Sequence, residues 1–111
     1  MLKGLGDLGK MGNVLKQAME LKGRIEEIKA ALAEERVEVS VGGGMVSVVM
    51  TGKMDVVSIK IEPEVVNKDD VEMLETLVRS AVNEAAARVR QLVETRMREA
   101  AGGIEIPGFN L

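Results

Sequence analysis

The sequence predicts a single α+β domain in the order α–β–β–β–α, in which two long helices flank a three-stranded antiparallel meander. Three observations support this fold class. Apolar residues recur at helical spacing before residue 35, alternate with polar residues between residues 36 and 62, and return to helical spacing after residue 69. The chain of 111 residues is long enough for one domain and too short for two.

The first helix is predicted over residues 13–34, in a region where seven apolar residues are spaced alternately three and four apart, as in an a/d heptad pattern. These residues are Met11, Val14, Ala18, Leu21, Ile25, Ile28 and Leu32. Asn13 can cap the start of this helix. Residues 1–12 contain four glycines, which oppose a stable helix, so we expect a flexible N-terminal arm there.

The strands are predicted over residues 36–41, 45–51 and 56–62, because valine and isoleucine alternate there with polar residues and glycines mark both turns. One face of this sheet is wholly apolar, and we expect the two long helices to cover it. The opposite face carries apolar residues among polar ones, which predicts a second contact surface and a dimer interface. The residues of that interface are Met45, Val49 and Val56.

The second helix is predicted over residues 69–101, with Asp69 and Glu72 at the N-cap and N3 positions. Gly102 and Gly103 end it, and residues 102–111 form a C-terminal tail. The helix would be ~50 Å long, whereas strands of about six residues are ~20 Å long. It therefore extends beyond the sheet by roughly 30 Å. That part must be covered by the first helix, a second copy of the chain or a ligand.

The composition excludes several classes of enzyme. The chain has no Cys and no His, so it has no disulfide framework, thiolate nucleophile, Cys-based zinc site or imidazole base. A metal site made of carboxylates alone, such as Glu72 with Glu75, is disfavoured because solvated acids near the start of a helix need no ligand. We expect no catalysis, no cofactor, no metal and no small-molecule substrate.

Hydropathy and cysteine content also bear on location. Every apolar run is far shorter than the ~18 residues that cross a membrane, so we expect no membrane partner. The absence of Cys gives no sign of an oxidising compartment, which favours a cytoplasmic protein.

Charge is unevenly distributed along the chain, whose formal net charge is −3. Residues 1–33 hold six basic and four acidic residues, residues 34–75 hold four and ten, and residues 76–111 hold five and four. The predicted helices are therefore basic relative to an acidic sheet, which is typical of a helical surface that binds the phosphates of duplex DNA. The residues expected to contact phosphate are Lys10, Lys16, Lys22, Arg24, Arg88, Arg90, Arg96 and Arg98.

An alternative interpretation of the same pattern is a protein-interaction or scaffold module that binds no DNA. A pI near 5.1 opposes avid DNA binding, and helices of mixed charge are ordinary protein surfaces. In this alternative, the heptad helix and the apolar residues of the sheet bind another protein. Ionic strength separates the two functions, because phosphate binding weakens steeply with salt and apolar helix contacts do not.

Several short motifs stand in a definite order along nearly the whole chain. They are Lys10–Ala18, Gly43–Val48, Gly52, Val57–Pro63, Asp70–Val78, Ala81–Ala85 and Ile106–Phe109. This ordered set resembles the YbaB/EbfC nucleoid-associated proteins of bacteria. The resemblance implies a homodimer whose helices project from a sheet core like tweezers and bind duplex DNA with low or variable sequence preference. It also implies a place in the nucleoid, with roles in nucleoid organisation and gene regulation.

The first helix departs from many members of that family. Where they are rich in glutamine and methionine, this chain has Glu20, Lys22, Arg24, Glu26 and Glu27. The departure concerns the surface expected to contact DNA rather than the fold.

Overall fold

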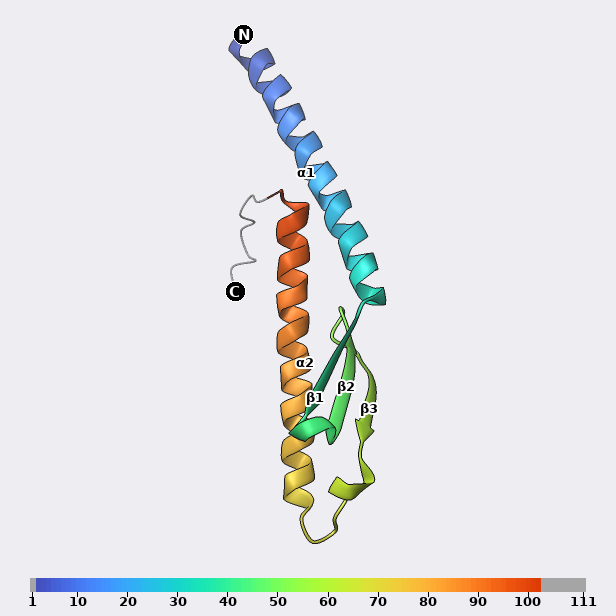
Figure 1. The fold of residues 1–111 in the computed structure, drawn as a ribbon. Helices are drawn as coiled ribbons and strands as arrows, with labels where there is room; N and C mark the ends of the chain where they lie inside the picture. The colour runs from blue at the N-terminus through green and yellow to red at the C-terminus, as the bar shows by residue number, and fades with distance from the viewer. Residues whose placement is uncertain (1, 103–111) are drawn as a thin grey trace.

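The fold has one long helix, a three-stranded antiparallel sheet and a second long helix in chain order, as the periodicity of the sequence predicts (Figure 1). The structure is a computed structural model that describes the backbone of residues 2–102 and the side chains of residues 11–102. Helix α1 (Leu2–Glu34) precedes strands β1 (Arg36–Val41), β2 (Val46–Thr51) and β3 (Val56–Ile61), and helix α2 (Val71–Ala100) follows them. The order α–β–β–β–α is therefore confirmed. The predicted tail beyond Gly102 lies outside the described residues.

Helix α1 begins at Leu2 rather than at residue 13, so the segment expected to be an N-terminal arm is helical. Each glycine costs a helix only ~1 kcal/mol relative to alanine, and no proline interrupts residues 2–34. The leucines and lysines between these glycines are good helix formers, and a helix already nucleated at residue 13 can propagate through them. The start predicted from the glycine content of residues 1–12 is therefore too late in the chain.

The strands pair in the order β1–β2–β3, with Val39 opposite Val48 and Val48 opposite Ile59. The three glycines Gly42–Gly44, all with positive φ, form the short 3₁₀ turn between β1 and β2. Val57 has no partner on β2, because the β2–β3 register shifts between Val49 and Met50. This bulge lies at the start of β3, next to the turn that joins β2 to β3.

Helix α2 covers β1 and β2 and leaves β3 open. The core consists of buried residues from β1 and β2 beneath alanines and a valine spaced four residues apart on α2. These residues are Val39, Val46, Val48, Met50, Ala81, Ala85 and Val89. Small alanines let the helix approach the valines closely, so a core without aromatic rings still packs. The expectation that both helices cover the apolar face is wrong, because α1 runs away from the sheet beside the far half of α2 (Figure 1).

The N-cap of α2 lies one residue later than the sequence predicts. Asp70 is the N-cap, and its side-chain carboxylate accepts a hydrogen bond of 3.3 Å from the backbone N–H of Met73. Asp69 instead belongs to the preceding turn, where its N–H donates to the side-chain oxygen of Asn67 at 2.9 Å. Neighbouring aspartates are both competent caps, so local sequence alone does not choose between them.

The molecule is strongly elongated, with extents of 81 × 22 × 18 Å. Helix α2 continues past the sheet and packs against the C-terminal half of α1, while α1 extends beyond the end of α2 (Figure 1). We call residues 11–20 of α1 the projecting segment, because every one of their side chains is exposed. Part of the predicted overhang of α2 is thus covered by α1, which was one of three candidates for that role.

Candidate nucleic-acid interface

The basic residues of α1 do not gather on one face. Lys16, Lys22 and Arg24 are all exposed, whereas the side chain of Lys10 lies outside the described residues. Lys22 follows Lys16 by six residues and precedes Arg24 by two, which places it ~120° from Lys16 and ~160° from Arg24 around the helix. A single DNA strand lying along α1 therefore cannot meet all three together.

Two arginines of α2 form ion pairs within the helix on its solvent side. The Arg88 guanidinium lies 3.0 Å from the Glu84 carboxylate, and Arg98 pairs with Glu94, each pair four residues apart. An exposed pair of this spacing, such as Arg88 with Glu84, contributes only ~0.3–0.5 kcal/mol and can exchange its carboxylate for a phosphate at little cost. In the other pair Arg98 is exposed, whereas the side chain of Glu94 is only 18% exposed. Both arginines are available to a polyanion.

Arg90 is exposed and follows Arg88 by two residues, so the two lie roughly 160° apart around the helix and flank the outer surface of α2 from opposite edges. Among the described residues, no carboxylate lies within ion-pair distance of it. Arg90 and Arg88 line a shallow hollow of about 360 Å³ on this outer surface. Its other lining residues are Glu84, Ala87, Gln91 and Glu94. The hollow combines guanidinium and amide donors with two carboxylates, so it suits a contact to a phosphate backbone better than burial of a free anion.

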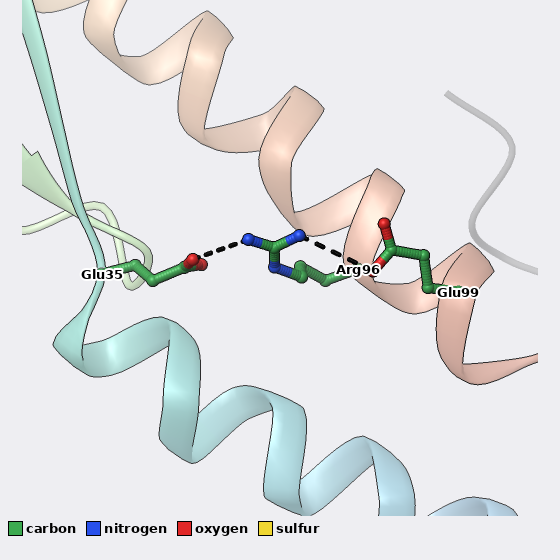
Figure 2. A network of polar contacts seen from close by, with 3 residues as sticks. All are labelled: Glu35, Arg96 and Glu99. Atoms are coloured by element: carbon green, nitrogen blue, oxygen red, sulfur yellow. Dashed lines mark hydrogen bonds and ion pairs between the residues drawn. The ribbon is translucent and has the colours of Figure 1, made fainter.

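Arg96 differs from the other three arginines, because its partner comes from outside its own helix. Figure 2 shows its guanidinium between two carboxylates, with Nη2 donating to Oε1 of Glu35 at 2.8 Å and Nη1 lying 3.6 Å from Oε2 of Glu99. The hydrogen bond and the negative charge of Glu35 raise the pKa of Arg96 above its ordinary value. Arg96 is therefore charged near neutral pH, as arginine ordinarily is.

The direction in which Arg96 points follows from the helical period. It stands seven residues after Val89, which is fully buried against the sheet, so both lie on nearly the same face of α2. That face meets the junction of α1 and β1, where Glu35 lies. Arg96 was predicted to contact phosphate together with Arg88, but the structure places the two in different surroundings.

Apolar side chains are exposed on both faces of the sheet. Of the predicted interface residues, Met45 and Val49 are half-buried and Val56 is exposed. The shift in register places Val56 opposite the buried Met50, and therefore on the core face rather than beside Val49. The apolar face of β3 is more open: Val57, Ile59 and Ile61 are 50, 44 and 36 % exposed. Ile59 and Ile61 stand opposite the buried Val48 and Val46, so they continue the core face beyond the cover of α2.

A family model described as the YbaB/EbfC DNA-binding family matches residues 8–104. The chain belongs to this family. The match covers α1 from residue 8 onward, the whole sheet and all of α2, so the resemblance seen in the order of the short motifs is confirmed.

Curated relatives of this YbaB/EbfC chain are described as nucleoid-associated proteins. One from Alkaliphilus metalliredigens is 44% identical over 106 residues, which cover 96% of this chain and 93% of the relative. Another, from Thermoanaerobacter sp., is 43% identical over 99 residues, or 89% of each chain. A crystal structure of an uncharacterized protein from Helicobacter pylori has the same fold, with a TM-score of 0.62, 24% identity and coverage of 81% of this chain and 99% of the other.

The sequence did not single out two residues that shape this surface of the YbaB/EbfC chain. Gln91 lies in the hollow between the arginines, and Glu35 holds Arg96. The position of Gln91, one residue after Arg90 and three after Arg88, was a usable signal, because residues three apart share a helix face. Glu35 carried no such signal, because its partner is 61 residues away.

Two further findings concern the described residues only. Among them, no three acidic side chains come together in a way that could hold a metal ion. No helix in the same part of the chain is both long enough and apolar enough to cross a bilayer.

Proposed function

We propose that this protein binds duplex DNA as a homodimer, mainly through phosphate contacts and with low or variable sequence preference. The observation that carries the proposal is that Arg88, Arg90 and Arg98 are all exposed, at different angles around the solvent side of α2. They stand on a helix that extends beyond an acidic sheet region, in a chain of a DNA-binding family. The field of the acidic sheet disfavours DNA there and favours it at the helices.

The residues around these arginines support backbone binding rather than base recognition. Glu84 and Glu94 alternate with the arginines along the outer surface of α2 and repel phosphates that approach closely. Each helix can therefore form only a few phosphate contacts, which position a protein on DNA without reading its sequence. Two copies of the helix in a dimer would double the number of these contacts.

The partner in the dimer is proposed to be a second copy of the chain that covers open apolar sheet surface. Two surfaces are available: the face that carries the predicted interface residues Met45 and Val49, and the apolar face of β3. The β3 face is the more exposed of the two, so a second copy would bury more apolar area there. Burial of apolar area contributes ~25 cal/mol per Å². The β3 face also adjoins the existing core, so a second copy would extend that core.

The names of the curated relatives support a cellular role. We infer that the protein is cytoplasmic, associates with the nucleoid, and contributes to nucleoid organisation and gene regulation. The support is that relatives which match this chain over most of their length are described as nucleoid-associated. We likewise propose that it acts by binding and not by catalysis.

The test is a titration of two duplexes of unrelated sequence at two salt concentrations. We expect similar affinities for both duplexes and a reduction of about 10³-fold or more between 50 and 200 mM salt if six or more phosphates are contacted. An affinity that is absent, or present but indifferent to salt, would refute the proposal. That outcome would favour the alternative of a protein-interaction module, whose partner would cover the exposed apolar residues Met11, Val14 and Met19 of the projecting segment.

A further inference from the structure

The direction of the projecting segment depends on contacts at the other end of α1. Every side chain of residues 11–20 is exposed, whereas Leu21, Ile25 and Ile28 are half-buried and Leu32 is buried. Residue 11 lies ~35 Å from the end of the helix. A rotation of about 10° at that end would therefore move residue 11 by roughly 6 Å. Successive phosphates on one DNA strand advance by only ~3.4 Å, so such a rotation changes which phosphates the segment meets.

Besides the packing of its apolar residues against α2, two polar contacts hold the end of α1. The backbone N–H of Gly52, in the turn between β2 and β3, donates to the carbonyl oxygens of Leu32 and Glu35 at 3.0 and 3.2 Å. This contact holds the end of α1 on the sheet. The side chain of Glu35 then reaches Arg96 on α2 (Figure 2). Within the described part of the chain, this is the one ion pair whose partners are more than four residues apart.

The surroundings of Glu35 make this ion pair more important than the exposed pairs on α2. Its side chain is 35% exposed, but its Oε2 is buried and has no hydrogen-bond partner among the described residues. A carboxylate that has lost part of its hydration depends on the charge that remains beside it. Arg96 supplies that charge from α2, so the pair links the two helices where they converge.

We propose that the Glu35–Arg96 ion pair is a positioning contact that sets the direction of the projecting segment relative to α2, and that duplex affinity depends on the pair through this direction. Only the statement about duplex affinity rests on the proposed function; the statement about the direction of α1 does not. It assigns Arg96 a role different from that of Arg88, Arg90 and Arg98, which are proposed to contact phosphate themselves.

The direction in which one substitution changes DNA affinity distinguishes a positioning role from a purely electrostatic one. Glu35→Gln removes a negative charge, and by the field alone this change should strengthen binding to a polyanion. If the pair positions α1, the same change should weaken binding, because the projecting segment no longer has a fixed direction. Glu34→Gln is the matched control: it makes the same charge change one residue earlier, at an exposed side chain for which the structure shows no ion pair within the described residues.

The direction of α1 can be measured without DNA. The chain has no Cys, so cysteines introduced at the exposed Gln17 and Asn83 can carry spin labels, with excess unlabelled protein present to dilute distances between subunits. We expect Glu34→Gln to leave the distance distribution unchanged and Glu35→Gln to broaden or displace it by several ångströms. We also expect Glu35→Gln to bind duplex DNA about threefold or more weaker than Glu34→Gln. An unchanged distribution, or equal or tighter binding, would overturn the proposal.

A charge exchange tests whether Arg96 itself touches phosphate. The double variant Glu35→Arg/Arg96→Glu reverses the pair, so it should restore the distance distribution and the affinity to within about twofold of the original. Restored distances with an affinity that stays low would overturn the proposal and make Arg96 a direct contact. Circular dichroism on each variant checks that it is folded. If the unaltered protein binds no duplex, the proposed function fails, while the label distances still decide whether the pair orients α1.

Discussion

Gly52 occupies a position at which the backbone of α1 leaves no room for a side chain. A Cβ placed on this residue would lie 2.3 Å from the carbonyl oxygen of Leu32, a distance at which the backbone itself must shift. The glycine N–H also donates to that oxygen and to the carbonyl oxygen of Glu35. The close approach and the hydrogen bonds are therefore two parts of one contact between the sheet and the end of α1.

Replacing this glycine by alanine should destabilise the protein. We expect Gly52→Ala to lower the free energy of unfolding by ~1–3 kcal/mol, as overpacking at a close contact does. The matched control is Gly23→Ala in α1, where nothing lies within 4 Å of the added Cβ. It should raise stability by ~0.5–1 kcal/mol, because alanine favours a helix. Chemical denaturation measures both changes, and a Gly52→Ala variant as stable as the original would show that the contact is dispensable.

The arginines of α2 also show which contacts could not be predicted from the sequence. The four arginines in the C-terminal half of α2 look alike in the sequence, and only their spacing distinguishes them. The structure separates Arg96 from the rest because its partner, Glu35, comes from a segment 61 residues away. A pairing of this kind depends on how the two helices cross, which no local pattern of residues contains. The ion pairs of Arg88 and Arg98 could have been predicted, since each partner stands four residues earlier.

Among the three strands, β3 is the one whose apolar face is not covered. All six of its residues are exposed, although Val57, Ile59 and Ile61 alternate as a core strand should. The order of helices and strands was predictable because the periods of 3.6 and 2 are local properties of the sequence. The coverage of β3 was not predictable, because it depends on the path of α1, which turns away from the sheet instead of lying across it.

One pair of substitutions on β3 should show which face holds the second copy. Ile59→Asp places a charge on the open core face, whereas Ser58→Asp makes a comparable change on the opposite face beside Val49. Light scattering at micromolar concentration should give twice the 12.0 kDa chain mass for the unaltered protein and for Ser58→Asp, and a monomer for Ile59→Asp. A dimer that survives Ile59→Asp and dissociates with Ser58→Asp would place the interface at Met45 and Val49 instead. A monomeric unaltered protein would refute the homodimer.

At the scale of the whole molecule, charge and shape act together. The acidic residues concentrate between residues 34 and 75, and the helices extend away from that region in a molecule 81 Å long. DNA is therefore expected along the helices and away from the sheet. The exposed arginines on α2 are few and lie among carboxylates, so affinity should come from several weak phosphate contacts added over two subunits.

The measurement that tests this account most directly is the slope of log affinity against log salt concentration, for the unaltered protein and for the double variant Arg90→Glu/Arg98→Glu. Arg79→Glu, which reverses one exposed charge on the part of α2 that lies over the sheet, is the control. If Arg90 and Arg98 bind phosphate, the double variant should bind DNA more weakly, and its slope should be shallower by about 0.9 for every phosphate that it no longer neutralises. Arg79→Glu should leave the slope unchanged. Equal slopes for the double variant and the unaltered protein would contradict the claim that α2 holds DNA by its phosphates.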